Sequence, residues 1–359
     1  MTNTRRAEGV RFEGGGPYFE ELSVGDAFES APALTLTSGM ADTHRAILGD
    51  RMRLSLDTTL SRRVTGADTP LAPPALVWNV AIGQSTTVTH HVVANLFYRG
   101  LVFRRYPVIG DTLHTRTEVV GLRQNSRKPG RAPTGLAALR VTTTDQAGRP
   151  VLDFVRCAML PLGDQSAETG HADDFVGITD TDAEAEEKSV AAQVGTWDLT
   201  AFPSAGGAGV PPEGQVVAVQ GGDVVSSAPE LARLTLNIAA VHHDATASSE
   251  GRLVYGGHTI GLALSQANRV LPDLITVTGW RGCDHTGPVR EGDTLHSELE
   301  IESVEPFSPA AQLIRLRSQV WARSTPQDQP RFVLDWRYTA LLPRGTEIRA
   351  PHGPEGRTA

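Results

Sequence analysis

The pentapeptide Gly-Asp-Thr-Leu-His occupies residues 110–114 and occurs again at residues 292–296. The tripeptide Val-Leu-Asp also recurs, at 151–153 and 333–335, and the two recurrences are displaced along the chain by the same offset. Both copies then reach a Leu-Pro pair, at 160–161 and 342–343. Two matches at one offset are hard to obtain by accident, so the sequence predicts a duplicated domain. Two copies exclude a solenoid, which needs at least three repeats.

Each copy is expected to contain one apolar helix followed by several strands. In the first copy, residues 71–82 form a long apolar segment, and four later segments alternate like strands between turn residues. Those strand segments are 92–103, 112–122, 136–144 and 151–160. One helix followed by consecutive strands predicts an α+β fold, with an antiparallel sheet wrapped on a helix. We expect the two repeats to span residues 17–162 and 214–345.

Residues 163–213, between the two copies, have a different composition. An acidic run comes first, and a tract rich in glycine, alanine and proline follows it. Such a composition cannot bury a core, so we expect a solvated linker. Residues 346–359 are expected to form a tail.

The composition limits the class of protein. A chain of 359 residues with 40% hydrophobic residues and a mean hydropathy of −0.20 fits two globular domains without a membrane span. The net charge of −8 argues against a nucleic-acid partner. The two cysteines, Cys157 and Cys283, lie one in each half and form no disulfide framework. Since the N-terminus also lacks the apolar run of a secretory signal, we expect a cytoplasmic protein.

The chemistry-bearing residues concentrate in the second copy, between residues 236 and 267. Asn237 and His242 are five residues apart, and Tyr255-Gly256-Gly257-His258 opens an apolar, helix-like run. A glycine pair at a helix start exposes backbone N–H groups that suit the oxygen of a polarised carbonyl. An imidazole returning over that helix start supplies a base beside an oxyanion site.

Each of these residues also has a purely structural interpretation. His242 could be a satisfied core histidine, Asn237 could cap a helix, and the glycine pair could permit close packing of helix on sheet. The first copy carries Asp50 and Ser55 where the second carries Asn237 and His242, and its helix near Trp78 lacks the glycine pair. We therefore predict one catalytic copy and one degenerate copy, with Trp78 shaping the pocket.

Basic residues and paired histidines suggest two further kinds of site. Arg104, Arg105, Arg127 and Lys128 are candidates for binding the phosphates of an anionic ligand, and a solvated strand edge is the alternative interpretation. His90-His91 and the isolated Asp284-His285 look like metal ligands but lack cysteine or carboxylate partners at ligand spacing, so no metal site is expected.

These motifs resemble those of the MaoC-like, hot-dog-fold acyl-CoA hydratases. Their signature is an acid, a histidine five residues later, a second acid, and a His-Gly pair that opens the central helix. The mesaconyl-CoA hydratase branch of that family is the most similar. The segments that carry this closer resemblance are Tyr18–Glu21, Val93–Leu96, Gly110–Leu113, Val119–Gly130 and Leu253–His258. The resemblance spans roughly residues 17–343.

The resemblance implies a double hot-dog, in which each half is a long helix gripped by a curved antiparallel sheet. It implies a hydro-lyase that catalyses reversible syn hydration of a 2-enoyl-CoA and needs no metal or redox cofactor. Mesaconyl-CoA and β-methylmalyl-CoA are the expected substrate and product. His242 is then the base, Asn237 holds water, Gly256 and Gly257 bind the thioester oxygen, and Tyr255 and His258 line the pocket.

This chain departs from the resemblance in two places. The first half matches the mesaconyl-CoA hydratase branch only loosely at Leu54–Asp57 and Leu76–Ala81. The other departure concerns the acid of the signature. The usual acid is Asn237, which can position water but cannot transfer a proton. The open alternatives are another branched or dicarboxylic enoyl-CoA, thioesterase chemistry, and a non-catalytic acyl-CoA-binding subunit. An acyl-CoA is the expected partner, and a homodimer is compatible with the sequence.

Overall fold

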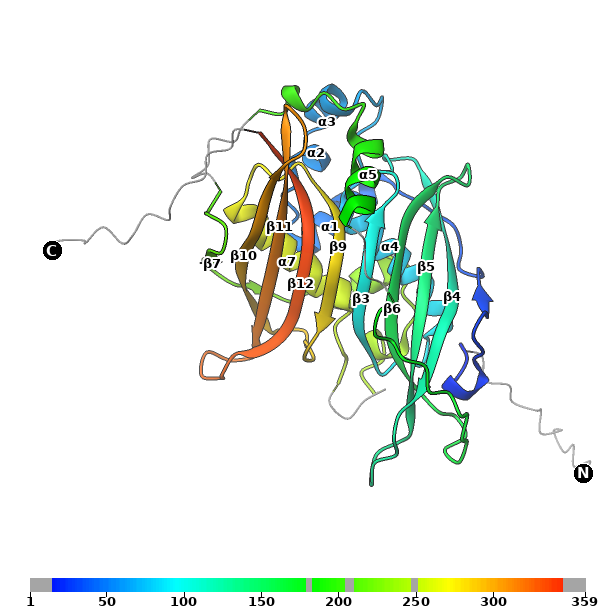
Figure 1. Ribbon diagram of the computed structural model, residues 1–359. Coiled ribbons are helices and arrows are strands. Elements are labelled where there is room, and N and C mark those ends of the chain that lie inside the picture. Colours follow the sequence, from blue (N-terminus) through cyan, green and yellow to red (C-terminus); the bar gives the residue numbers. More distant parts are fainter. Residues whose placement is uncertain (1–14, 179–182, 204–209, 247–250, 345–359) are drawn as a thin grey trace, which may run out of the picture.

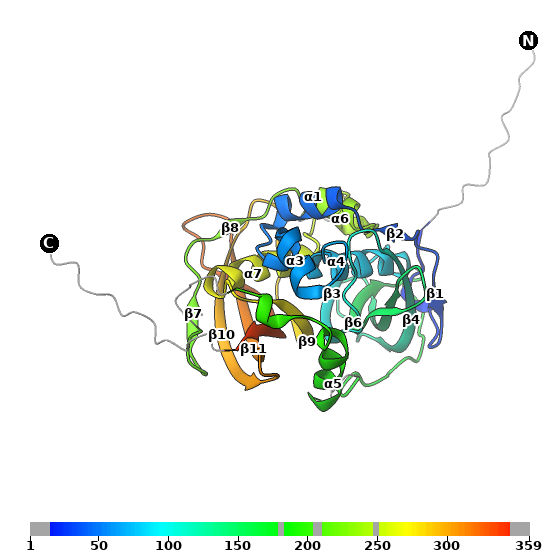
Figure 2. The same ribbon diagram turned by 90° about the horizontal axis from the view of Figure 1, so that it is seen from above.

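A single curved sheet wraps around two central helices (Figures 1 and 2). The computed structural model describes residues 15–178, 183–203, 210–246 and 251–344. The expected tail at 346–359 and the glycine-rich tract at 204–209 lie outside the described residues. The arrangement confirms the predicted α+β double hot-dog.

The first repeat contains short elements, the central helix α4 and four long strands. Pro74 opens α4, where its missing N–H leaves no hydrogen bond unmade. Every residue of α4 is buried, as expected for a helix enclosed by the sheet. The elements are β1 (Ala27–Phe28), β2 (Leu34–Thr35), α1 (Ser38–Leu48), α2 (Arg53–Leu56), α3 (Thr58–Thr65), α4 (Pro74–Gln84), β3 (Ala94–Phe103), β4 (Thr112–Gln124), β5 (Thr134–Thr144) and β6 (Pro150–Pro161).

The second repeat follows the same order. Its central helix α7 and its strand β9 are displaced from α4 and β3 by the same offset as the repeated peptides. The elements are β7 (Val216–Ala218), β8 (Asp223–Val224), α6 (Ala228–Leu234), α7 (Gly256–Val270), β9 (Thr276–His285), β10 (Thr294–Pro306), β11 (Ala311–Arg323) and β12 (Arg331–Pro343). None of the helices in the described part of the chain is both long and apolar enough to cross a membrane.

The two repeats share one antiparallel sheet. Its order is β1-β4-β5-β6-β3-β9-β12-β11-β10-β7, with β2 and β8 paired beside β4 and β10. The halves meet where β3 pairs with β9, and Tyr98 lies opposite Cys283 in that register. Because the β3–β9 hydrogen bonds join the two copies, neither half ends in a free sheet edge at this seam.

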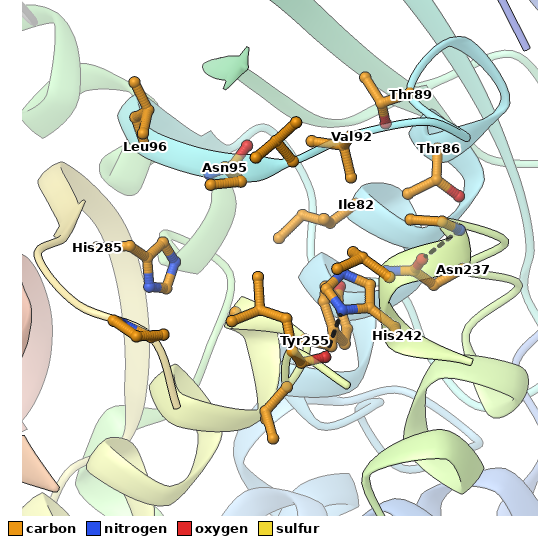
Figure 3. A pocket seen from close by; sticks show the side chains of 18 of the residues that line it. Ile82, Thr86, Thr89, Val92, Asn95, Leu96, Asn237, His242, Tyr255 and His285 are labelled. Carbon is orange, nitrogen blue, oxygen red and sulfur yellow. Dashed lines mark hydrogen bonds between the residues drawn. The ribbon is translucent and has the colours of Figure 1, made fainter. Parts of the chain in front are cut away.

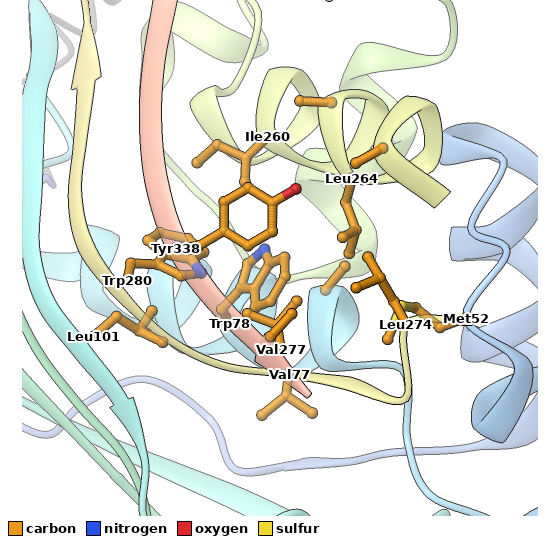
Figure 4. Packing of buried hydrophobic residues seen from close by; sticks show 14 of the residues in the cluster. Met52, Val77, Trp78, Leu101, Ile260, Leu264, Leu274, Val277, Trp280 and Tyr338 are labelled. Carbon is orange, nitrogen blue, oxygen red and sulfur yellow. The ribbon is translucent and has the colours of Figure 1, made fainter. Parts of the chain in front are cut away.

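Aromatic side chains from both repeats fill the core behind this seam. Trp78 of α4 packs against Trp280 of β9 and Trp336 of β12, with ring centroids 4.9 and 6.2 Å away. Figure 4 shows Trp78, Trp280 and Tyr338 together beside Ile260 of α7. All three tryptophans are fully buried, so this cluster holds the first repeat against the second through apolar burial.

The central helices cross at Gly257. A Cβ built on Gly257 would overlap Asn79 Oδ1 of α4 and come within 2.8 Å of the Tyr255 ring. The Tyr255 hydroxyl in turn donates to the Asn79 carbonyl at 3.0 Å. The absence of a side chain at 257 therefore sets how closely α4 approaches the start of α7.

The segment between the repeats is more structured than the sequence predicts. It contains the helix α5 (Ala183–Val194), whose Val190 and Val194 are buried in the core. Ser189 and Gln193 donate to the carbonyl of Phe103 at the end of β3. The expectation of a solvated linker is corrected for this helix, because its valines are four residues apart and share one apolar face.

We predict that Gly257→Ala destabilises the fold by about 1–3 kcal/mol, because the added methyl group overpacks the helix crossing. The matched control is Gly39→Ala on α1, where a Cβ meets only Thr37 Oγ1 at 3.9 Å. Thermal unfolding followed by circular dichroism should show a lower Tm for Gly257→Ala and an unchanged or higher Tm for Gly39→Ala. Equal melting temperatures for the two variants contradict this account of the crossing.

Candidate active site

A cavity of about 930 Å³ lies between the two repeats. One wall comes from the first repeat: the end of α4, the following 3₁₀ turn at Ser85–Val88, and the start of β3. The other wall comes from the second repeat, between Asn237 and the start of α7. In Figure 3, Thr89, Val92 and Asn95 face His242 and Tyr255 across the cavity.

The loop that carries Asn237 and His242 is fixed to the first repeat. The N–H of Ile238 donates to Thr86 Oγ1 at 2.9 Å, and the N–H of Ala240 donates to the His90 carbonyl at 3.0 Å. The loop leaves α6 through Leu236, which has a positive φ of 58°. This left-handed residue turns the chain so that Asn237 enters the buried interface.

The side chain of Asn237 has a defined orientation. The N–H of Ala239 requires an acceptor and donates to Asn237 Oδ1 at 3.0 Å, which assigns the amide oxygen. Among the described residues, no acceptor bonds Nδ2 of Asn237. That nitrogen is a donor on a residue that lines the cavity, so it can hold the oxygen atom of a water or hydroxyl.

His242 is held in one tautomer. Its Nδ1 lies 2.8 Å from the carbonyl oxygen of Leu253, which can only accept, so Nδ1 carries the proton and Nε2 has the free lone pair. The pKa of His242 is lowered to about 4, mainly by burial and also by the nearby His243 and Arg156, against the opposite effect of the Leu253 bond. The imidazole is therefore neutral at pH 7 and can accept a proton.

The glycine pair is divided between the cavity and the helix crossing. Gly256 lines the cavity, whereas Gly257 is buried against Asn79. They are the first two residues of α7, whose own N–H groups have no intrahelical acceptor, whereas the N–H of His258 donates to the Tyr255 carbonyl. A Cβ on Gly256 would come within 2.6 Å of His285 Nε2, so the helix start is closely covered by that ring.

Several cavity residues were not found from the sequence as site residues, among them His285 and Arg156. His285, at the end of β9, lines the cavity, and burial together with His242 lowers its pKa to about 4. Arg156 of β6 also lines the cavity and is 2% exposed. An arginine between the apolar residues Val155 and Cys157 was the available signal for Arg156. His285 stood out in the sequence only as a metal-ligand candidate without partners.

The structure does not place Trp78 or His258 on this cavity. Trp78 precedes Asn79 on α4 and lies in the tryptophan core. His258 is fully buried away from the cavity, and burial lowers its pKa to about 4. The expectation that they line the pocket is revised, because both side chains project from the central helices into the core, whereas Tyr255 does line the cavity.

The four basic residues proposed for phosphate binding divide into two groups. Arg104 and Arg105 follow the far end of β3, roughly 25 Å along the strand from the cavity residues at its start. Arg105 is also paired with Asp111 and Asp145 at 2.7 and 2.6 Å. This position and pairing remove both from the vicinity of the cavity.

Arg127 and Lys128 lie closer, because they follow the end of β4 that is level with the start of β3. Arg127 donates to Glu168 at 2.7 Å and to the Ala167 carbonyl. Lys128 is exposed. Of the four, Lys128 and Arg127 keep a position compatible with the outer part of a coenzyme A.

The first repeat has the same loop geometry with different chemistry. Gly49 has a positive φ of 68° before Asp50, as Leu236 has before Asn237, and Asp50 Oδ1 accepts from the N–H two residues on. Burial raises the pKa of Asp50 to about 6. Ser55, the counterpart of His242, does not line the cavity. Among the described residues, no group of three or more His, Cys, Asp or Glu is placed to hold a metal ion.

Comparison with known proteins agrees with this architecture. No protein-family model matches the sequence. A Mycobacterium tuberculosis protein with a double hot-dog fold is 51% identical over 92% of this chain and 99% of its own, with a TM-score of 0.82. Two curated relatives are each 27% identical over 92% of this chain: β-methylmalyl-CoA dehydratase of Chloroflexus aurantiacus, covered over 97%, and mesaconyl-CoA hydratase of Cereibacter sphaeroides, covered over 98%.

The chain belongs to the MaoC-like double hot-dog dehydratases. The family predicted from the sequence is thereby confirmed, and so is the enzyme class, since both curated relatives carry the names of hydro-lyases. For a MaoC-like protein, the cavity between the repeats is the natural candidate for the active site: it contains the expected histidine, the polar residue five positions before it, and the start of the second central helix.

Proposed function

We propose that this protein catalyses the reversible syn hydration of an enoyl-CoA thioester, with mesaconyl-CoA and β-methylmalyl-CoA as the substrate pair. The observation that carries the proposal is the placement of His242 and Asn237 on one wall, beside the first turn of α7. An acceptor nitrogen, an amide donor and a helix start are the three groups that water addition to a conjugated thioester needs.

Activation of water uses the first two groups. A water held by Asn237 Nδ2 donates one proton to His242 Nε2, and its oxygen then forms a bond to C3 of the enoyl group. The Leu253 carbonyl holds the Nδ1 proton throughout, so it stabilises the imidazolium that forms. Asn237 acts by position and donation only, since a carboxamide neither gains nor loses a proton at neutral pH.

The charge that develops is placed on the thioester oxygen. As the C3–O bond forms, the π electrons of the C2=C3 bond move to give an enolate, whose oxygen accepts a hydrogen bond from the N–H of Gly256, the member of the glycine pair that lines the cavity. One such donor is typically worth about 10²–10³ in rate. His242 then returns its proton to C2, and delivery of both atoms from one side gives syn addition.

The names of the curated relatives support the mesaconyl-CoA pair. The reaction adds the elements of water without oxidation, so it requires no redox cofactor. Coenzyme A enters as part of the substrate, and Arg127, Lys128 and the cavity residue Arg290 are the cationic groups we assign to its outer part. The first repeat supplies the other wall of the cavity, which includes His90 and His91, and we assign the base to His242 alone.

We predict that His242→Ala lowers kcat about 10²- to 10⁴-fold on mesaconyl-CoA while the circular dichroism spectrum is unchanged. The matched control is Ser55→Ala, at the counterpart position of the first repeat, which should keep near wild-type turnover. Gain or loss of one water is followed by mass spectrometry on a panel of enoyl-CoA and 3-hydroxyacyl-CoA thioesters. Equal losses in the two variants would contradict a single catalytic repeat.

The same panel separates the other functions. Release of free thiol from the thioesters identifies a thioesterase, in which water attacks the carbonyl carbon and not C3. Binding of the thioesters without any conversion identifies a non-catalytic acyl-CoA-binding subunit. Conversion of other branched or dicarboxylic enoyl-CoA thioesters in preference to mesaconyl-CoA retains the hydratase and changes the substrate.

The pH profile is a second prediction. His242 must be neutral to act as base, and its pKa is lowered to about 4, so kcat/KM for hydration should be flat from pH 8 to about 5 and fall as the pH drops through 4. The buried His44 and His285 have pKa values lowered to about 3 and 4, so the unfolded state takes up protons first and stability also falls below about pH 6.5.

Recovery of full activity after return to pH 7 distinguishes titration of the base from unfolding. An acid limb with a midpoint near 6.5, in protein that remains folded, would show that the base is a solvated histidine and not His242.

A further inference from the structure

Arg156 is a cation buried without a carboxylate partner. Its Nη2 donates to the Ser85 carbonyl at 3.0 Å and to Thr89 Oγ1 at 2.8 Å, and its Nη1 donates to Asn95 Oδ1 at 3.3 Å. The Nε–H has no partner. Among the described residues, Arg156 forms no ion pair. An arginine stays protonated in proteins, so this charge is present and uncompensated.

Other arginines of the sheet are paired with carboxylates. Arg317 of β11 forms a two-pronged bond with Asp335, and Arg337 of β12 is paired with Glu302 at 3.0 Å. Both are more exposed than Arg156 and yet are neutralised by carboxylates. An isolated buried charge costs much more than a paired one, so a cation kept here without a protein anion needs a function.

The position of Arg156 is in the cavity wall opposite the proposed base. Two of its partners, Thr89 and Asn95, line the cavity from the first repeat and face His242 in Figure 3. Arg156 is also close enough to lower the pKa of His242. A ligand group bound to Arg156 would therefore lie across the reacting carbon atoms from the imidazole.

The repeat shows that the strand does not require an arginine here. At the offset of the repeated peptides, the counterpart of Arg156 on β12 is Tyr338, a buried ring stacked on Trp336 at 3.7 Å. The second repeat thus fills the same position of the hot-dog with an aromatic core residue. At this position of the repeat, an arginine occurs only in the first copy, where it lines the cavity.

We propose that Arg156 binds a carboxylate carried by the acyl group, so that the cavity selects dicarboxylic enoyl-CoA thioesters over monocarboxylic ones. This rests on the proposed function and names its substrate class. The carboxylate replaces the missing anionic partner, and the guanidinium gains a charge-assisted hydrogen bond. Thr89 and Asn95 hold the guanidinium in position. In mesaconyl-CoA the free carboxylate is attached to the carbon that receives the hydroxyl, so this contact also places that carbon near Asn237.

The test measures binding of two saturated thioesters that cannot be hydrated. Methylsuccinyl-CoA carries the free carboxylate, and 2-methylbutyryl-CoA has a methyl group in its place. Isothermal titration calorimetry compares them on wild type, Arg156→Gln, Arg156→Lys and the control Arg337→Gln. We expect the wild type and Arg337→Gln to bind methylsuccinyl-CoA at least tenfold more tightly. Arg156→Gln should lose most of this preference by weaker binding of methylsuccinyl-CoA alone, and Arg156→Lys should keep part of it.

Equal affinities of the wild type for the two thioesters overturn the proposal, as does an undiminished preference in Arg156→Gln. If Arg156→Gln fails to fold, Arg156→Lys decides the question. A preference of Arg156→Lys equal to that of the wild type would then assign recognition of the carboxylate to another group. A binding preference without any hydration refutes the proposed hydratase and leaves Arg156 as the carboxylate site. Hydration of mesaconyl-CoA without a binding preference supports the proposed hydratase and refutes Arg156 as the carboxylate site.

Discussion

The contact between α4 and α7 determines where the active site can form. Gly257 leaves room for Asn79, and the Tyr255 hydroxyl bonds to the backbone of α4 at that level. The start of α7 is therefore held at the interface of the repeats, with Gly256 at the cavity. The cavity lies there because the Asn237–His242 loop and the Ser85–Val88 turn border the same helix start.

The duplication preserved the backbone and changed the side chains. In both repeats a left-handed residue precedes a polar residue whose Oδ1 accepts from the N–H two residues on. Only in the second repeat is this turn followed by a histidine, His242, that reaches the cavity. Only the first repeat places an arginine of its last strand, Arg156, on the cavity wall. One cavity built from two unequal halves can have a base on one side and a cation on the other.

Sequence reasoning recovered what periodicity and repetition encode. The common offset of the repeated peptides predicted the order of helix and strands, and β9 begins at that offset from β3. The spacing of Asn237 and His242, with the glycines after them, predicted residues that the fold brings together. These inferences succeed because local spacing fixes which residues share a loop or a helix turn.

The inferences that the structure revises required tertiary packing. Trp78 and His258 were assigned to a pocket, but the sequence does not show which face of a central helix is turned to the core. Arg105 was assigned to phosphate, but Asp111 and Asp145 neutralise it. Arg156 and His285 reach the cavity from strands far away in the chain, and α5 packs on the end of β3 through contacts that composition alone does not encode.

The most direct test of the account is a crystal structure with methylsuccinyl-CoA bound, combined with the stoichiometry of binding in solution. We expect one thioester per chain, with its carbonyl oxygen at the Gly256 N–H, its C3 between His242 and Asn237, and its free carboxylate at Arg156. A second molecule beside Asp50 in the first repeat, or an acyl group bound away from His242, would contradict a single asymmetric site.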